Sequence, residues 1–350
     1  MPDTGAHLAA LHAAWDAFGD PRSVTAITEA SPKVSTNEVY RLALDDGSRV
    51  YGKVSSYGSY FLFAEDHDRL FRCTELLQGT RFAGFLAPVL GHGERPYTWY
   101  DGRLWVAFYD EVAQGRRLPA TLDDAQVEQL GREIADFHRV CSDIAPALPP
   151  TSNSVKSDAV HLLDLLSSPF APRNYGMPAE QIGVLWRHTH ELLLRLEALR
   201  YDAWPRIPIL VDWNLGNFSV VDQPDGSFRL FTRWDYDWFR LETRLHDFYF
   251  LSRVSSATGD RTSWTYSPHT LVEPRFARFV RCYHEVFPLT EADIAFLPDA
   301  YLFFVLNYVV REGARFFRPD LCERFRREAV RVYLPALANL DISPLLAAVR

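Results

Sequence analysis

Cysteine, long apolar runs and an excess of positive charge are all scarce in this chain, and each scarcity excludes a class of protein. The four cysteines lie far apart without a C-x-x-C spacing, which argues against a disulfide framework and against a cysteine zinc site. The longest apolar run, 301–310, is about half the length that spans a bilayer. The N-terminus has no basic segment followed by an apolar one. We therefore expect a cytoplasmic protein with reduced thiols and no membrane partner.

Positive charge is also too sparse to favour nucleic acid as a partner. The chain has 37 Lys and Arg against 45 Asp and Glu, a formal net charge of −8, whereas affinity for a phosphate backbone requires clustered basic residues. This balance suits a small cationic substrate instead. The Walker lysine motif, a strand-borne G-x-G-x-x-G, the G-x-S-x-G elbow and H-E-x-x-H are all missing. No repeat is present, and nothing in the sequence indicates an oligomeric state.

Apolar residues, in contrast, are abundant enough for a large core. They make up 47% of 350 residues, a length that exceeds one typical domain and predicts two lobes. Breaks in the residue pattern at 110–115 place the boundary between an N-terminal lobe, 1–112, and a C-terminal lobe, 113–350. Alternating residues predict antiparallel strands in the first lobe, and helical spacing predicts an opening helix and one further helix. The strands are expected at 23–28, 38–44, 49–55, 85–90 and 103–109, and the helices at 7–18 and 63–78.

The second lobe is expected to be larger and mainly helical. Apolar residues recur there at intervals of three or four, and a loop rich in Pro, Ser and Asn covers 146–157. The predicted fold class is therefore α+β, with a five-stranded antiparallel sheet in the first lobe. Helices are expected at 121–140, 179–199, 243–256, 274–287, 291–317 and 319–338.

The most informative residues lie between two of these helices. Asp212 and Asn217 follow an apolar run at 207–211, and Asp235 and Asp237 follow another apolar segment at 228–231. A turn at 223–226 between two strands would bring the two groups to one end of a sheet. Their oxygen atoms are the hard ligands that magnesium prefers. The sequence leaves open whether Asp237 is a second metal ligand or only accepts hydrogen bonds from its own loop.

These motifs resemble the aminoglycoside phosphotransferase and choline kinase-like superfamily. The chain is similar to that family along nearly its whole length, because Asp212 and Asn217 match the end of His-x-Asp-x-x-x-x-Asn, and Asp235 matches the acid of the later Ile-Asp-Trp/Phe-Glu/Asp segment. Lys53, in a third strand, and Asp247 also match. The resemblance implies a protein-kinase-like, two-lobed fold and an ATP- and Mg²⁺-dependent kinase, with GTP as the other candidate nucleotide.

The same resemblance assigns a role to each matching residue. Asp212 would be the catalytic base, Asn217 and Asp235 would hold magnesium, and Lys53 would bridge the phosphates. Asp247 would tie down the backbone of the catalytic loop, and His138 is interpreted as a packed helix residue. The partner of Lys53 is open between Glu65, the first choice, and Glu75. The remaining nucleotide contacts are expected from Ser35 and Thr36 at the phosphates and from the backbone of Tyr109 and Val112 at adenine.

The sequence departs from the family at Leu210, which stands in place of the family's histidine. The primary hypothesis is a kinase that phosphorylates a hydroxyl of a small polar molecule, with an aminoglycoside-like antibiotic, amino sugar or amino alcohol favoured. Trp238 and Tyr236 beside the metal acids are the aromatic residues to test against the acceptor. Leu210 motivates the alternative, a catalytically impaired, nucleotide-binding pseudokinase with a regulatory or scaffold role. A protein kinase is disfavoured because no Ala-Pro-Glu-like segment follows Asp235.

Overall fold

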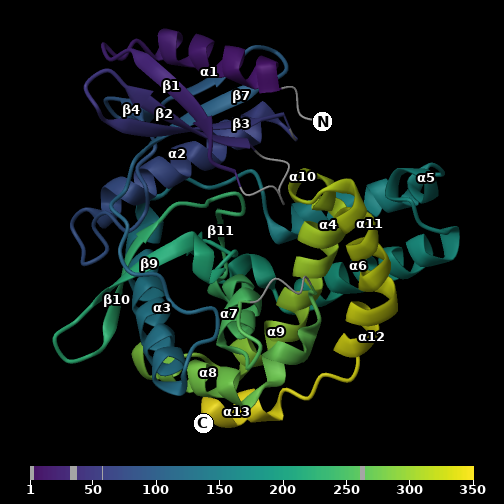
Figure 1. Cartoon of the computed structure of the whole chain (residues 1–350). Helices are drawn as coiled ribbons and strands as arrows, with labels where there is room; N and C mark the ends of the chain where they lie inside the picture. Colours follow the sequence, from purple (N-terminus) through teal and green to yellow (C-terminus); the bar gives the residue numbers. More distant parts are fainter. Residues whose placement is uncertain (1–3, 32–37, 57, 261–264) are drawn as a thin grey trace. The chain divides into compact units, whose positions relative to one another are not determined.

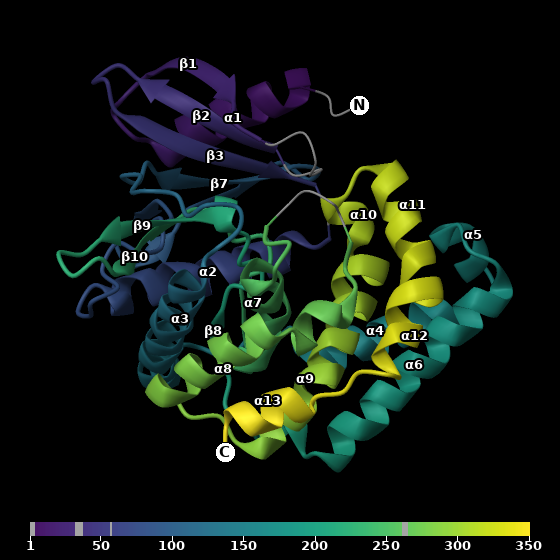
Figure 2. The same cartoon turned by 60° about the horizontal axis from the view of Figure 1, so that its bottom comes forward.

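The computed structural model describes residues 4–31, 38–56, 58–260 and 265–350. The chain divides into two compact units. Unit 1 comprises Met1–Ala113, Thr232–Trp234 and Ala314–Arg318, and unit 2 comprises Gln114–Phe231, Asp235–Gly313 and Pro319–Arg350. Figures 1 and 2 trace the elements of both units along the chain.

Unit 1 is built on a five-stranded antiparallel sheet with the strand order β1-β2-β3-β7-β6. This confirms the predicted α+β class and the five-stranded N-terminal sheet. The elements of this unit, in chain order, are α1 (Thr4–Phe18), β1 (Val24–Glu29), β2 (Glu38–Leu44), β3 (Arg49–Ser55), α2 (Tyr60–Leu77), β4 (Gly91–His92), β5 (Arg95–Pro96), β6 (Thr98–Tyr100) and β7 (Trp105–Asp110).

The two faces of this sheet are covered by different helices, as Figure 1 shows. Alternate residues of a strand point to opposite faces, and the buried residues of α1 pack with Val50, Val54, Val106 and Phe108 on one of them. Gly52 lies on that face, where an added Cβ would come within 2.5 Å of Leu11, so a glycine is needed for the close approach of α1. The other face, which carries Lys53, Trp105 and Tyr109, lies against α2.

The prediction of a strand at 85–90 is wrong. The fifth strand is β6, and 85–90 forms only isolated bridges, at Leu86 and Val89. Pro88 has no N–H to donate, so a continuous ladder cannot form through it, although its carbonyl accepts from Asp110 N at 3.0 Å. The apolar residues of the segment are buried all the same, which is why their pattern resembles that of a strand.

Unit 2 is mainly helical, as expected. Its α-helices are α3 (Asp124–Ile144), α4 (Val155–Ser167), α5 (Ala171–Tyr175), α6 (Ala179–Ala198), α7 (Phe248–Ser255), α8 (Pro274–Val286), α9 (Glu291–Phe304), α11 (Pro319–Glu328), α12 (Leu334–Leu337) and α13 (Ser343–Ala348). The π-helices η6 (Val305–Arg311) and η7 (Ala329–Tyr333) extend α9 and α11. The short helix α10 (Gly313–Phe316) follows η6 in the chain and belongs, except for Gly313, to unit 1. The 3₁₀ segments are η1 (Ala145–Ala147), η2 (Tyr201–Ala203), η3 (Leu215–Asn217), η4 (Arg244–Asp247) and η5 (Pro268–Val272).

The long helix α3 carries His138, which supports the loop that contains Asp212. It begins at a capping box in which Asp123 accepts from the backbone of Gln126 and the Gln126 side chain returns to the Asp123 backbone. Gly131 allows α8 to cross closely, because a Cβ there would lie 2.7 Å from the Phe279 carbonyl. The helix α3 therefore packs closely on α8, and its His138 is fully buried in unit 2.

The loop predicted at 146–157 is shorter than expected. A second capping box, between Ser154 and Ser157, starts α4 at Val155, and α5 follows soon after. The segment Glu291–Arg311 is long and apolar enough to cross a membrane, but 78% of its apolar window is buried inside the structure, as in the core helix of a folded unit.

Two short strand pairs position the motif residues. β8 (Ile207–Ile209) pairs with β11 (Arg240–Glu242), and β9 (Phe218–Asp222) pairs with β10 (Phe228–Arg233). The turn predicted at 223–226 is present, with Gly226 at φ 83°. It joins β9 to β10, however, and not the strand before Asp212 to the strand before Asp235.

Candidate active site

The two groups of motif residues leave one strand pair at the same end. Ile209 is opposite Arg240 in the antiparallel ladder of β8 and β11. The chain leaves β8 through Leu210 toward Asp212, and it enters β11 from Asp237 through Phe239. In an antiparallel pair these two segments extend from the same end of the ladder. The two groups of residues thus lie at the same end of a strand pair. That pair is β8 and β11, and not two strands joined by the turn at 223–226.

The loop after β8 is fixed by a fully buried carboxylate, Asp247. Its Oδ1 accepts the Val211 N–H at 2.7 Å, and its Oδ2 accepts Trp213 Nε1–H at 2.6 Å. His138 Nε2 lies 2.9 Å from the same Oδ2. A carboxylate only accepts, so Nε2 donates to it, and Nδ1 lies 2.8 Å from the Tyr283 hydroxyl. Asp247 therefore ties the loop to α3 and α8.

The backbone of this loop is strained at Val211, which has φ 56°. A β-branched residue rarely adopts the left-handed region, and strain of this kind is concentrated at functional sites. Leu210 before it is buried, and its N–H lies 3.5 Å from Asp247 Oδ2. The loop is thus held by Asp247, with the buried Leu210 at its start.

Asp212 and Asn217 are brought together by the same loop. Asp212 is half-buried, and its Oδ1 accepts the Asn214 N–H at 3.1 Å. Asn217 directs its Nδ2 toward the Asp212 carbonyl at 3.5 Å, and its own N–H donates to the Asn214 carbonyl at 2.9 Å. The spacing of five residues therefore corresponds to one compact turn that presents an acid and an amide together.

A further anchor of this loop, Asp260, was missed from the sequence. Its Oδ2 accepts the Leu215 N–H at 2.6 Å, and its own N–H donates to the Ala120 carbonyl at 2.7 Å. Burial raises the pKa of this carboxyl, against the lowering effect of the Leu215 N–H. Only the tertiary fold places residue 260 beside residue 215, so no local pattern could have found it.

The second acid group is a turn in which Asp235 Oδ1 accepts the Asp237 N–H at 3.2 Å. Both acids are half-buried. The aromatic residues between and after them do not face solvent: Tyr236 is 8% exposed and Trp238 is 7% exposed. Trp238 packs on Tyr308 with ring centroids 4.8 Å apart. Both aromatics therefore belong to the core of unit 2 in this structure.

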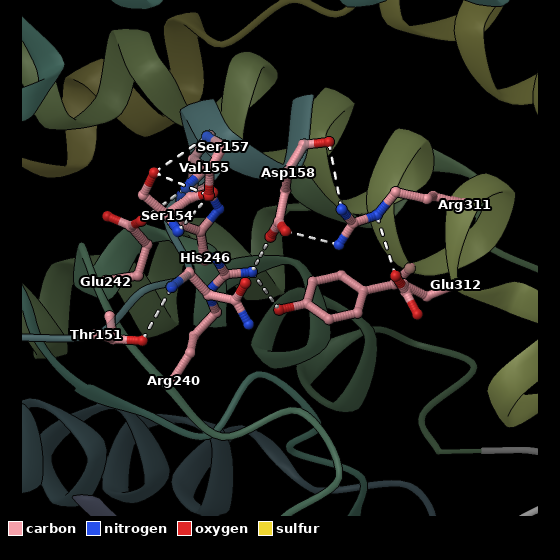
Figure 3. Close-up of polar contacts among 12 residues, drawn as sticks. Thr151, Ser154, Val155, Ser157, Asp158, Arg240, Glu242, His246, Arg311 and Glu312 are labelled. Atoms are coloured by element: carbon pink, nitrogen blue, oxygen red, sulfur yellow. Dashed lines mark hydrogen bonds and ion pairs between the residues drawn. The ribbon is translucent and has the colours of Figure 1, made fainter. Parts of the chain in front are cut away.

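A buried ionic network holds β11, the strand that follows these acids (Figure 3). Asp158 of α4 lies 2.9 Å from Arg240 Nη1 and accepts from Arg311 at 2.7 Å. Glu242 Oε2 accepts the Val155 N–H at 3.1 Å, and its Oε1 accepts from the Tyr201 hydroxyl. Removing one member of a buried ion pair is costly, so the network fixes β11 against α4 and η6.

Among the residues described in unit 2, no three His, Cys, Asp or Glu side chains gather as a metal site on their own. The expected set differs from such a group, because it comprises one amide, Asn217, and two acids, Asp235 and Asp237. All three side chains offer oxygen atoms, which are the ligands that Mg²⁺ prefers. The assignment remains a prediction.

In unit 1, Lys53 occupies the middle of β3 on the face covered by α2. It is paired in the ladder with Val39 and Ala107. Its charge acts on His67 of α2, another residue that the sequence did not single out. Burial, and then the charge of Lys53, lowers the pKa of His67 from 6.5 to about 3. His67 is therefore neutral at ordinary pH.

The hydrogen bonds of His67 agree with that state. Nδ1 lies 2.6 Å from the Phe63 carbonyl and must donate to it, and Nε2 lies 2.6 Å from the Tyr109 hydroxyl. Since Nε2 of this neutral ring has no proton, it accepts from the tyrosine. The side chain of Tyr109 is thus bound to α2 inside unit 1, and its backbone is paired with Tyr51 in the ladder of β3 and β7. Its predicted backbone contact with adenine stays a prediction.

The other residues predicted to contact the nucleotide or Lys53 differ in their surroundings. Glu65 forms an ion pair with Arg69 one turn along α2, at 3.3 Å, and Glu75 is exposed. Val112 is half-buried directly after β7. Ser35 and Thr36 lie outside the described residues.

Comparison with known proteins shows which solved structures share this fold. No protein-family model and no curated protein sequence matches the chain. Among solved structures, the amicoumacin kinase hAmiN has a TM-score of 0.59 at 16% identity, with 91% of this chain and 90% of that one covered. The chain has the fold of the aminoglycoside phosphotransferase and choline kinase-like superfamily. A microcompartment-associated aminopropanol kinase, at TM-score 0.58 and 17% identity, covers 99% of both chains.

The same fold extends to a further acceptor class. Ethanolamine kinase of Plasmodium vivax matches with a TM-score of 0.53 at 12% identity, over 89% of this chain and 83% of that one. The small-molecule kinase fold thus accounts for both units and confirms the resemblance at the level of structure.

The buried His67 of this kinase fold makes stability depend on pH. In the unfolded chain its pKa is near 6.5, and in the folded chain it is about 3, so protonation favours the unfolded state. Its contribution is complete above pH 6.5 and is lost as the pH falls toward 3, by up to about 1.4 kcal/mol per pH unit. We expect His67→Gln to flatten the fall in unfolding free energy, measured with urea between about pH 7 and 5.

His12 provides the control for this prediction, because it lies exposed on α1 of the same unit. His12→Gln should leave the pH slope of the parent protein unchanged. An equal slope in the His67 variant and the parent would contradict the burial of a neutral imidazole.

Proposed function

We propose that the protein is an ATP- or GTP-dependent phosphotransferase that uses magnesium and acts on a hydroxyl group of a small polar molecule. The observation that supports this best is the turn that holds Asp212 beside Asn217. It is fixed through Asp247 and leaves the β8–β11 ladder at the same end as Asp235. Phosphoryl transfer depends mainly on positioning charged groups around the reacting oxygen atoms, and such a fixed turn suits that task.

Each residue has one role in this proposal. Asp212 orients the acceptor hydroxyl and takes its proton. Asn217 and Asp235, with Asp237 as a further ligand, hold the metal, and Lys53 contacts the nucleotide phosphates. When bound, magnesium would neutralise the charge of those phosphates. The backbone of Tyr109 and Val112 and the donors of Ser35 and Thr36 complete the nucleotide contacts in the proposal.

The acceptor class rests on charge and on the related structures. The chain is acidic overall, with a net charge of −8, and the proposed site adds Asp212, Asp235 and Asp237. The amicoumacin kinase structure contains AMP-PNP, Ca²⁺ and Ami, and an APH(2")-IIIa structure contains GDP and kanamycin. An amine-bearing acceptor, such as an aminoglycoside, amino sugar or amino alcohol, is therefore the class that we propose.

Purified protein should show a rise in melting temperature with Mg-ATP or Mg-GTP that EDTA abolishes. It should also transfer a phosphoryl group to one or more members of an acceptor set of aminoglycosides, amino sugars and amino alcohols, detected as the added mass. Neutral polyols of matched size serve as the control acceptors. A protein that neither binds nucleotide nor phosphorylates any member of the set would contradict the proposal.

Leu210 supports a second candidate, a pseudokinase that binds nucleotide without turnover. Against it, the described loop is supported although residue 210 is a leucine, through Asp247 and its contacts to Val211, Trp213 and His138. Nucleotide binding without transfer to any acceptor would favour this second candidate. A saturable shift together with a phosphorylated product would exclude it.

A further inference from the structure

A small cavity in unit 2 lies near the loop 256–260, apart from the motif residues. Its volume is about 30 Å³. By the same measure a water molecule needs roughly 10–15 Å³, so the space suits one small ion and is far too small for a nucleotide or a sugar ring. Its polar lining includes Arg253, His269, Ser256, Thr258, Ser267 and Thr270.

The lining has the chemistry of an anion site. It contains one permanent positive charge, a histidine and several hydroxyl groups. The Thr270 hydroxyl donates to Ser252 Oγ at 2.7 Å. The Ser256 and Thr258 hydroxyls lie 3.1 Å apart, and when Ser256 donates in that pair the proton of Thr258 can point to an anion. No carboxylate is found among the lining residues that the structure describes. The Arg253 guanidinium would repel a cation in this cavity, whereas an anion would accept hydrogen bonds from it.

Arg253 itself is held by aromatic rings. Its Cζ lies 5.1 Å from the centroid of the Phe250 ring and 5.4 Å from that of Tyr266. Among the described residues, its guanidinium makes no ion pair and no hydrogen bond. Contact through a ring face leaves the N–H groups at the edge of the guanidinium as donors.

The acids closest to this cavity are engaged with other groups. Asp260 feels the charge of Arg253, which lowers its pKa against the larger effect of burial, but its Oδ2 accepts the Leu215 N–H. Glu273 accepts the Ala257 N–H at 2.9 Å, and its other oxygen lies 3.8 Å from His269 Nε2. Neither acid neutralises Arg253 directly.

We propose that this cavity binds one small inorganic anion of the size of chloride, with Arg253 as the charge and the hydroxyl groups of Thr258 and Ser267 as further donors. The bound anion would stabilise the loop 256–260. That loop packs tightly on the segment before α3, because a Cβ at Gly259 would lie 2.1 Å from the Ala120 carbonyl. Since Asp260 ends the loop and holds Leu215, the anion would also stiffen the turn that carries Asp212.

The first test measures melting temperature in chloride and in gluconate at equal ionic strength. The parent protein should show a saturable rise with chloride, on the order of 2 °C when chloride is about tenfold above its Kd. Arg253→Gln should remove the difference between the two salts. Thr258→Val, which keeps the shape of the side chain, should reduce it. Arg187→Gln on α6, an exposed position, should behave like the parent.

Equal melting temperatures of the parent in the two salts would overturn the proposal, and so would a chloride effect that survives in Arg253→Gln. The Thr258→Val variant keeps the test decisive if the arginine variant does not fold. An unchanged chloride effect in Thr258→Val would then count against the site.

The second test locates the ion. Crystals grown with bromide in place of chloride should show an anomalous scattering peak in contact with the Arg253 guanidinium. A data set without a peak there, at a bromide concentration that saturates the thermal shift, would contradict the site. No nucleotide or acceptor enters either experiment, so their outcome is independent of the proposed phosphotransferase activity.

Discussion

Asp212→Asn should lower phosphoryl transfer by about 10²–10⁴-fold while the protein stays folded and still binds nucleotide. The amide has nearly the same volume as the carboxylate, and its oxygen can still accept the Asn214 N–H that Asp212 Oδ1 accepts at 3.1 Å. It cannot take a proton from an acceptor hydroxyl. The loss should therefore appear in kcat, with the nucleotide-induced rise in melting temperature preserved.

Asp225→Asn is the matched control for this experiment. Asp225 is an exposed acid in the turn between β9 and β10 of the same unit, where it accepts the Ser227 N–H at 3.0 Å. It receives the same change in charge and should keep the turnover of the parent protein. Unchanged turnover in the Asp212 variant would remove Asp212 from the role of base, whatever the nucleotide affinity.

Asp247→Asn should produce the largest loss of stability, about 3–5 kcal/mol in the free energy of unfolding. The native carboxylate accepts from Val211 N, Trp213 Nε1 and His138 Nε2. An asparagine would turn an NH₂ group toward one of these donors and leave a buried N–H without a partner. Denaturant unfolding, followed by the tryptophan fluorescence of the whole chain, measures the change.

The control for this variant is Asp222→Asn in β9. Asp222 forms an exposed ion pair with Arg116, whose Nε lies 2.9 Å from both carboxylate oxygens. Exposed pairs contribute little to stability, so its unfolding midpoint should stay close to that of the parent. Similar midpoints for the Asp247 and Asp222 variants would mean that the buried carboxylate does not anchor the loop.

Elements with a local cause were predictable from the sequence. The strands β2 and β3 have the predicted ranges, because alternating residues and the turn at Asp45-Asp46-Gly47 act within a few positions. The segment 85–90 was mistaken for a strand, since burial on one side of an irregular segment produces the same apolar pattern as a ladder. The start of α4 was also missed, because the Pro, Ser and Asn residues before and around it are typical of a loop. The helix begins at the capping box of Ser154 and Ser157.

In the candidate site, too, the residues with a local cause were predictable and the others were not. The Asp212 and Asn217 spacing was visible because one turn contains both residues. The support of that turn was not, since His138, Asp247 and Asp260 reach it only through the tertiary fold. The left-handed backbone at Val211 is disfavoured for valine, so no propensity argument would have proposed it. Glu65 also pairs with Arg69 four residues later, a contact that the spacing along one helix makes predictable; its role toward Lys53 stays a prediction.

Unit 1 is assembled from three separate stretches of the chain, which affects when it can fold during synthesis. Its sheet lies within the first 113 residues, but the unit also includes Thr232–Trp234 and Ala314–Arg318. Arg233 donates to the Phe85 carbonyl at 2.6 Å and accepts the Ala87 N–H at 3.0 Å. During synthesis these hydrogen bonds must wait while all of Gln114–Phe231 is translated, on the order of ten seconds. Unit 1 therefore begins at the start of the chain, but it cannot be completed until Ala314–Arg318 has also been translated.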